Sequence, residues 1–257
     1  MSVEISLAGK VVLVTGGSRG VGAETVRLFT QAGARVVFSY KSAEDAAAAV
    51  VADCGGPDRC RAVRQELSSI EDGRALVEAA TGIWGRLDAL VANHGIWPPH
   101  DAPIQSMADG QWREPIGVNL DSIFGLVKAA VAQFKSRAGV AHIVFVASTA
   151  AQRGEAFHAD YAASKGALIS LTKSLSSELA GQGILVNCVA PGWIATDMSA
   201  PALATEGGRN RIFATIPLGR VATTSEIAGP IVFLCSPWAG FISGEVMNVN
   251  GGAVLVG

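Results

Sequence analysis

Short runs of β-branched and other apolar residues alternate with longer stretches rich in alanine and leucine along the whole chain. The apolar runs predict seven strands, at residues 11–14, 35–39, 62–63, 87–92, 142–147, 185–189 and 246–249. These runs are continuously apolar rather than alternating, which is typical of strands covered on both faces in a parallel sheet. The pattern therefore predicts an α/β fold, a single-domain Rossmann-type doubly wound parallel sheet of about seven strands with helices on both faces.

Composition places the chain among globular proteins. Hydrophobic residues make up 49% of the 257 positions and charged residues only 16%, a balance that excludes an intrinsically disordered chain. We expect one domain over residues 1–257. The net charge of −2 leaves no basic excess for nucleic acid, and every apolar run is shorter than the roughly 18 residues that a membrane span needs. Neither nucleic acid nor a membrane is an expected partner.

The four cysteines, Cys54, Cys60, Cys188 and Cys235, include no CxxC pair and have no histidine at ligand spacing. We therefore expect reduced, mostly buried thiols and no metal site. The first ten residues contain the acidic Glu4 and no apolar segment of the kind found in a secretory signal. This predicts a cytoplasmic protein.

A glycine-rich turn, TGGSRGVG at residues 15–22, follows the first predicted strand and precedes a helix predicted at residues 23–32. Glycine lets the backbone approach a pyrophosphate, and the helix N-terminus presents free N–H groups and a partial positive charge. With 30 glycines in the chain such spacing also arises by chance, so its place between strand and helix carries the inference. The turn predicts binding of a dinucleotide, with a plain structural turn as the alternative.

The end of the second predicted strand indicates which dinucleotide is bound. A carboxylate placed about 20 residues after the glycine turn would bind the ribose 2′-OH of NAD. This chain has Lys41 and Ser42 there, and Arg19 projects from the turn toward the same region. A pair of solvated surface cations is the alternative interpretation. We expect NADP(H) to be favoured over NAD(H).

Tyr161 and Lys165 lie four residues apart in the segment YAASK, on one face of a helix predicted to run to about residue 178. A neighbouring ammonium stabilises a phenolate and lowers the tyrosine pKa, which is ordinarily near 10. Such a pair can exchange a proton with a carbonyl, whereas an exposed helical pair without function is the alternative. His158 is expected to be a surface residue at the helix start.

Together these residues resemble the short-chain dehydrogenase/reductase family, and the likeness covers essentially the whole chain. The motifs, in family order, are TGGSRGVG at 15–22, Asn119 within GVNL, Ser148, YAASK at 161–165, PGWIAT at 191–196 and the ending at 243–252. The nearest likeness is to NADP(H)-dependent 3-oxoacyl-carrier-protein reductases and to sugar or polyol dehydrogenases of the same build. The resemblance implies an oxidoreductase that interconverts a carbonyl and a secondary alcohol by hydride transfer.

The resemblance also implies roles for individual residues. Tyr161 would be the general acid and base, Lys165 would lower its pKa and hold the nicotinamide ribose, and Ser148 would hydrogen-bond the substrate carbonyl. Asn119 would anchor a water that links Lys165 to solvent. The residues implied to contact the cofactor are Gly16, Ser18, Arg19, Gly20, Val21, Gly22, Tyr40, Lys41, Ser42, Glu66, Leu67, Asn93, Gly95, Tyr161, Lys165, Pro191, Gly192, Ile194 and Thr196.

Two positions depart from the family pattern. The segment ANHG at 92–95 stands where the family usually has NNAG, so one amide is lost at Ala92 and an imidazole is gained at His94 near the nucleotide. Glu66 stands where the family usually has an aspartate to meet the adenine. Neither change touches the proton chemistry.

The substrate is expected over the nicotinamide, under a lid at about residues 193–218 that contains two prolines and a pair of glycines. The candidates for lining an apolar pocket are Trp97, Phe157, Trp193, Met198 and Phe213.

A small-molecule carbonyl or alcohol is the expected partner, and an acyl carrier protein is only weakly supported. Lys128, Lys135 and Arg137 offer cations to an acidic carrier, but the helix after Lys165 ends without one. The apolar ending 246–256, together with the resemblance, predicts a homotetramer.

The sequence disfavours two other function classes. A non-catalytic NADP(H)-sensing module would be expected to lack the tyrosine, the lysine or the serine, and this chain retains all three. A methyltransferase-like domain binds no diphosphate that would use the glycine turn. Turnover of NADPH with any ketone separates an enzyme from a sensor.

Overall fold

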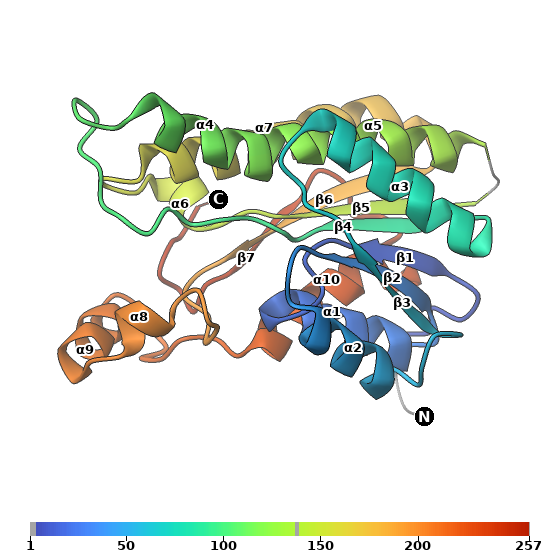
Figure 1. Cartoon of the computed structure of the whole chain (residues 1–257), viewed down its shortest axis with the longest axis horizontal. Helices are drawn as coiled ribbons and strands as arrows, with labels where there is room; N and C mark the ends of the chain where they lie inside the picture. The colour runs from blue at the N-terminus through green and yellow to red at the C-terminus, as the bar shows by residue number, and fades with distance from the viewer. Residues whose placement is uncertain (1–3, 137–138, 257) are drawn as a thin grey trace.

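The protein, described by a computed structural model over residues 4–136 and 139–256, is built around a twisted parallel sheet (Figure 1). Within these residues the sheet has seven strands in the order β3-β2-β1-β4-β5-β6-β7. The strands are β1 (Val11–Val14), β2 (Arg35–Tyr40), β3 (Cys60–Arg64), β4 (Ala89–Ala92), β5 (Ala141–Val146), β6 (Ile184–Pro191) and β7 (Val246–Val249). The predicted doubly wound parallel sheet is confirmed.

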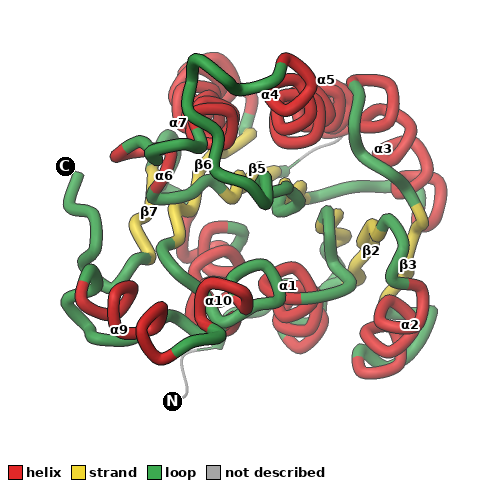
Figure 2. The backbone as a smooth tube through the Cα atoms, turned by 60° about the vertical axis from the view of Figure 1, so that its left-hand side comes forward, coloured by secondary structure: helices red, strands yellow, loops and turns green. Residues whose placement is uncertain are grey.

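Helices cover both faces of the sheet (Figure 2). One layer contains α1 (Gly20–Gln31), α2 (Glu44–Asp53) and α10 (Thr224–Leu234), and the other contains α3 (Ile70–Trp84), α5 (Ser122–Lys135) and α7 (Ala159–Leu179). In β1, Val12 and Val14 join the core under the first layer, whereas Val11 and Leu13 join the core under the second. A strand buried on both faces has to be apolar at every position, which explains the continuous runs.

Strand β3 is longer than the predicted 62–63. It is the outermost strand of the sheet, paired only with β2 among the described strands, and its Arg61 and Arg64 are exposed. Backbone pairing with β2 from Val36↔Cys60 to Tyr40↔Arg64 holds these polar residues in the strand. A search for apolar runs therefore finds only its middle.

The remaining helices are short or irregular. They are α4 (Asp109–Ile116), a π-helical turn (Gly117–Asp121), α6 (Ala150–Arg153), α8 (Ala200–Leu203), α9 (Glu206–Ala214) and 3₁₀ turns at Ala180–Gln182 and Pro237–Ala239. The continuous stretch 109–135, from α4 to α5, is long and apolar enough to cross a membrane by length and composition alone. In the fold, its α5 part packs beside α3 in the layer that covers one face of the sheet, as core helices of this length do.

The segment predicted as a lid, 193–218, leaves the sheet after β6 and carries α8 and α9 away from the two helical layers (orange in Figure 1). Its base is closed by backbone hydrogen bonds, from Ala222 N to Trp193 O at 2.9 Å and from Ala195 N to Ala222 O at 2.9 Å. Met198 and Leu218 on this segment are 56% and 66% exposed. The segment 193–218 is therefore fixed at its base by backbone hydrogen bonds, while its apolar side chains Met198 and Leu218 stay exposed.

Candidate active site

The predicted site residues gather at one edge of the sheet, where the parallel strands end. The glycine turn follows β1, Lys41 and Ser42 follow β2, and Asn93 and Gly95 follow β4. Ser148 follows β5, and Gly192 follows β6. Ligands of doubly wound folds bind outside this carboxyl edge. Of the implied cofactor contacts, Leu67 has its side chain in the core and can offer only its backbone.

The glycine turn is shaped for a phosphate. Helix α1 begins at Gly20, three residues before the predicted start, so Gly20, Val21 and Gly22 form its first turn, where N–H groups have no carbonyl of the same helix to donate to. Gly16 has φ of +67°, a conformation that other residues rarely adopt. A Cβ at Gly22 would lie 2.1 Å from the Gly16 carbonyl oxygen, so only glycine allows this approach. The turn fits a diphosphate at the helix N-terminus.

The loop after β4 supports the glycine turn from beneath. Asn93 Nδ2 donates to Thr15 O at 3.0 Å, and the backbone N–H groups of Asn93 and His94 donate to Thr15 Oγ1 at 3.0 and 3.1 Å. Asn93, one of the implied cofactor contacts, therefore uses its side-chain amide to hold the turn. Gly95 leaves room for a cation, since a Cβ there would lie 2.9 Å from Lys165 Nζ.

His94, the departure noted in the sequence, has both ring nitrogens occupied within the protein. Nδ1 lies 2.7 Å from Thr15 Oγ1, and Nε2 lies 3.0 Å from Val118 O and 2.8 Å from Ser122 Oγ. Because a carbonyl only accepts, Nε2 carries the proton and Nδ1 accepts from Thr15. Burial and the charge of Lys165 lower the His94 pKa to about 3. The imidazole ties the glycine turn to the π-helical turn.

Asn119 is completely buried in that π-helical turn. Its Oδ1 accepts from Ile96 N at 2.8 Å, and its Nδ2 donates to Ile96 O at 3.1 Å and to Ser164 Oγ at 3.0 Å. Ser164 Oγ in turn donates to Tyr161 O at 2.8 Å. Ser164 was not singled out from the sequence, although it lies inside YAASK. A π-helical turn in a helix frequently marks a functional site.

Tyr161 and Lys165 are buried on α7, 9% and 3% exposed. Lys165 Nζ donates to Val146 O at 2.9 Å, and burial lowers the lysine pKa to about 8. Burial raises the pKa of Tyr161, against a hydrogen bond with Ser148 that lowers it. The sequence predicted a net lowering of this pKa by Lys165. That direction is wrong for the protein by itself, because desolvation of the phenolate outweighs the stabilising contacts.

Ser148 meets Tyr161 from the end of β5. Its hydroxyl lies near enough to the phenol to lower the Tyr161 pKa, and its Oγ accepts from Ala150 N at 3.1 Å. The serine, tyrosine, lysine and asparagine of the predicted catalytic set are therefore brought together, with Lys165 Nζ and Asn119 Oδ1 both adjacent to Gly95.

The end of β2 is an exposed, charged surface. Lys41 forms an ion pair with Glu66, their side chains 68% and 59% exposed, and Arg19 lies 3.8 Å from Asp197. Arg64 reaches the same place, its Nε donating to Lys41 O at 3.3 Å. Arg64, the last residue of β3, was not singled out from the sequence, because only its pairing opposite Tyr40 brings it to this edge.

The loop after β6 closes over the glycine turn. A Cβ at Gly20 would lie 3.4 Å from Thr196 Cγ2, and a Cβ at Gly192 would lie 3.0 Å from Asn250 Cα. Pro191 ends β6 in register with Val249. The segment after β6 therefore lies against the glycine turn at Thr196. It contains the implied cofactor contacts Pro191, Gly192, Ile194 and Thr196.

Beside Tyr161, Trp97 and His158 form an aromatic cluster. The Trp97 ring centroid lies 4.0 Å from that of His158 and 4.8 Å from that of Tyr161. His158 lies at the helix start as predicted, as the N-cap residue of α7, but it is 5% exposed rather than a surface residue. Trp97 covers it, and Asp101 accepts from its Nε2 at 3.1 Å. Among the predicted pocket residues, Phe157 is 53% exposed.

The chain was compared with known proteins. Residues 16–254 match the family model described as enoyl-(acyl carrier protein) reductase. The chain is 38% identical to a 3-oxoacyl-[acyl-carrier-protein] reductase of Vibrio cholerae over 98% of this chain and 100% of that protein.

Two solved structures from Brucella melitensis are similar over nearly the whole chain. A glucose/ribitol dehydrogenase of the short-chain dehydrogenase/reductase type has a TM-score of 0.90 and 35% identity, covering 99% of this chain and 100% of that one. A 3-ketoacyl-(acyl-carrier-protein) reductase complexed with NADH has a TM-score of 0.88 and 32% identity, covering 97% and 100%. None of these relatives supports the non-catalytic alternative. The chain belongs to the short-chain dehydrogenase/reductase family and is an NAD(P)-dependent oxidoreductase that interconverts a carbonyl and an alcohol.

Proposed function

We propose that Tyr161, Ser148, Lys165 and Asn119 carry the proton chemistry of this reaction. The supporting observation is that these side chains lie together at the carboxyl edge of the sheet: Ser164 links Asn119 to the backbone of Tyr161, and Lys165 Nζ and Asn119 Oδ1 both lie beside Gly95. The bound cofactor supplies or accepts the hydride. Tyr161 exchanges the proton with the substrate oxygen, and Ser148 donates a hydrogen bond to that oxygen as it gains charge.

In the same proposal, Lys165 and Asn119 act behind the phenol. The Lys165 ammonium supplies the positive charge that a phenolate at Tyr161 needs, and it holds the nicotinamide ribose. Asn119 anchors a water through which Lys165 reaches solvent. The residues that would hold the cofactor are those implied by the family motifs, around the glycine cradle at residues 16–22 and the space left at Gly95.

We also propose that NADP(H) is bound at least tenfold more tightly than NAD(H). Two cations, Lys41 and Arg64, lie at the ends of β2 and β3, where a 2′-phosphate would sit, and a third, Arg19, lies in the glycine turn after β1. One charge-assisted phosphate contact contributes about 1.5 to 3 kcal/mol, enough for a decade or more. Titration calorimetry with NADPH and NADH tests this, and equal dissociation constants contradict it.

For the substrate, we propose a free small carbonyl compound or alcohol rather than a carrier-bound one. Lys128 and Lys135 lie on α5, and the predicted partner cation Arg137 lies outside the described residues. Helix α7 has no basic residue in its last turn, and the following turn Ala180–Gln182 has none. The expected basic face for an acidic carrier is therefore incomplete on this side.

Two substrate classes are consistent with this proposal: 3-oxoacyl thioesters, and sugars or polyols. NADPH consumption with acetoacetyl-CoA and with ethyl acetoacetate tests the first class, and NADP⁺ reduction with a sugar and polyol panel tests the second. The segment 193–218, with exposed Met198 and Leu218, is proposed to cover whichever substrate binds.

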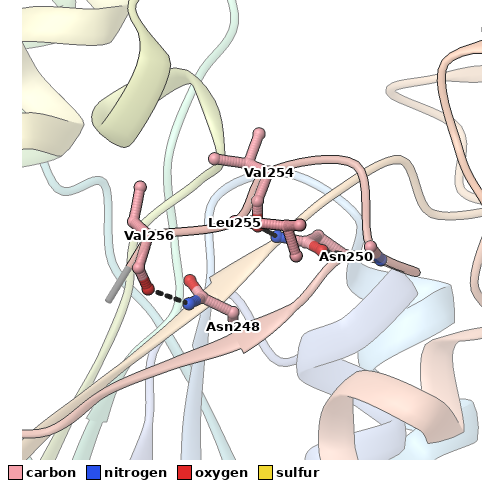
Figure 3. A pocket seen from close by; sticks show the side chains of 6 residues that line it. Asn248, Asn250, Val254, Leu255 and Val256 are labelled. Carbon is pink, nitrogen blue, oxygen red and sulfur yellow. Dashed lines mark hydrogen bonds between the residues drawn. The ribbon is translucent and has the colours of Figure 1, made fainter.

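We propose that the protein works as a homotetramer in the cytoplasm. Apolar side chains near the C-terminus face outward: Phe241 is fully exposed, Leu255 is 88% exposed and Trp238 is 59% exposed. Leu255 also lines an open depression of about 480 Å³, together with Asn248, Asn250, Gly252, Val254 and Val256 (Figure 3). A second copy of the chain would bury this surface. Light scattering that shows a stable monomer at micromolar concentration contradicts the proposal.

A further inference from the structure

The imidazole of His158 contains a buried polar atom that the fold leaves unpaired. His158 is 5% exposed, and its Nδ1 has no hydrogen-bond partner among the described residues. Buried polar atoms nearly always have a partner, and an exception needs an explanation, because burial without one costs free energy comparable to a lost hydrogen bond.

The other ring nitrogen is held by a neighbouring loop. Ala102 N donates to Phe157 O at 3.0 Å, and this backbone bond brings Asp101 beside His158. His158 Nε2 donates to Asp101 Oδ1 at 3.1 Å. With the proton on Nε2, Nδ1 of the neutral ring carries a lone pair and accepts hydrogen bonds. An unpaired lone pair is also cheaper to bury than an unpaired charged N–H group.

The backbone next to His158 is strained. Phe157 has φ of +65°, the only positive φ among the described residues other than glycine. An aromatic residue in this region persists only where the surrounding structure imposes it, and such positions cluster at active sites and ligand clamps. The backbone strain at Phe157 is independent of the unpaired nitrogen, which belongs to the next residue, His158.

The imidazole that carries the unpaired nitrogen packs on Trp97, the same ring that contacts the reacting Tyr161. His158 is the N-cap residue of α7, and Tyr161 is the third residue of that helix. Trp97 contacts both rings, at 4.0 and 4.8 Å between centroids. A substrate whose oxygen meets Tyr161 thus has its next carbon atoms within reach of His158.

We propose that His158 Nδ1 accepts a hydrogen bond from a substrate hydroxyl on the carbon next to the reacting carbon, with Asp101 orienting the ring and Trp97 forming the wall beside it. The ligand class is an α-hydroxy ketone, or a sugar or polyol that contains this unit. A thioester carbonyl has no proton to donate to this nitrogen, so a 3-oxoacyl substrate leaves it unpaired. The inference rests on the reaction and the tyrosine role proposed above, and it narrows their substrate.

The test compares hydroxyacetone with butanone, which differ by a hydroxyl in place of a methyl group. We expect the wild-type enzyme with NADPH to prefer hydroxyacetone in kcat/KM by at least about tenfold, chiefly through KM, because only the hydroxyl satisfies the buried acceptor. His158→Phe should reduce the ratio to about one. His158→Asn, whose side-chain oxygen can accept, should keep part of the preference.

Matched controls separate this role from folding. His100→Phe makes the same change at an exposed histidine next to Asp101 and should leave both activities unchanged. If thermal melting shows that His158→Phe is unfolded, Asp101→Ala and His158→Asn carry the comparison. Equal use of the two ketones by the wild type, or a preference that survives in the folded His158→Phe variant, overturns the inference.

The outcome is distinguishable from failure of the proposed function. An enzyme that reduces ethyl acetoacetate without preferring hydroxyacetone keeps the proposed reaction and overturns only the hydroxyl subsite. An enzyme that reduces no carbonyl overturns the proposed function. The subsite is then decided by NMR of the histidine side-chain nitrogens, in which hydroxyacetone, but not butanone, should shift the His158 Nδ1 signal; no shift overturns it.

Discussion

The catalytic centre and the end of β2 lie on the same edge of the sheet, yet they are built in opposite ways. Asn119 is fully buried, Lys165 is 3% exposed, and their polar atoms are bonded to backbone carbonyls and buried hydroxyls. Lys41 and Arg19 have side chains 68% and 72% exposed and pair with surface carboxylates. A buried, fully bonded cluster loses its function when one atom is removed, whereas exposed ion pairs change affinity in small steps.

The largest loss of turnover is expected from substitutions in the buried catalytic centre. Tyr161→Phe removes only the hydroxyl and keeps the ring contact with Trp97, so the fold and cofactor affinity should survive while turnover falls by about 10² to 10⁴-fold. Ser148→Ala should also lower turnover with little effect on cofactor affinity. Steady-state kinetics on one accepted carbonyl, with NADPH binding followed by fluorescence, measure both. If Tyr161→Phe keeps more than about a tenth of wild-type turnover, Tyr161 is not the acid and base.

The two ends also differ in how far the sequence predicts them. Tyr161 and Lys165 were found from spacing, because a helix fixes which residues share a face, and the structure brings them together with Ser148 and Asn119. The burial of His158 and the sign of the Tyr161 pKa shift were not predicted, because both depend on Trp97 and other side chains distant in sequence. Spacing along one helix carries no information about desolvation.

At the exposed end, the sequence predicted cations but not their partners. Lys41 and Glu66 are 25 positions apart and meet because β2 and β3 pair side by side, which also brings Arg64 to Lys41. The strands themselves were predicted to within a few residues, since apolar runs mark them, but β3 was shortened because its polar residues are held by backbone pairing. The pattern of apolar runs does not show which residues of two neighbouring strands pair.

The next largest effect is expected at Lys41. Lys41→Ala removes a cation from the place proposed for the 2′-phosphate, and NADPH affinity should fall by about tenfold or more while NADH affinity stays within about twofold. Titration calorimetry with both cofactors measures the ratio. A parallel loss of both affinities would show that Lys41 serves the fold or the shared part of the cofactor instead.

Lys165 allows the buried end to be probed by pH. Its pKa of about 8 means that the free enzyme loses the ammonium above that pH, so kcat/KM for NADPH should fall about tenfold per pH unit beyond it. Stability should move the other way: between about 8 and 10.5 the unfolded lysine binds a proton that the folded one does not, so the free energy of unfolding rises with pH.

Lys165→Met removes the titrating group, so it should abolish the rise in stability that belongs to this residue. Chemical denaturation across this pH range measures the rise in the wild type and in the variant. A Lys165→Met protein with an unchanged stability slope would assign the titration to another group.

The smallest effect is expected at Glu66, where a substitution should raise NADPH affinity rather than lower it. Glu66 pairs with Lys41 on the surface, and exposed pairs of this kind are worth about 0.2 to 1 kcal/mol. Glu66→Gln frees the lysine and removes a negative charge from the 2′-phosphate region, so NADPH affinity should rise by about two- to fivefold with NADH affinity unchanged. The gain should shrink at high salt, since screening already weakens the repulsion.

The double variant Lys41→Ala with Glu66→Gln should lose most of this gain, because the released cation is absent. If Glu66 instead contacts the adenine, as its position after β3 suggests by resemblance, Glu66→Gln lowers the affinity for both cofactors alike. Calorimetry on the four proteins therefore decides whether this carboxylate tunes the phosphate region or holds the base.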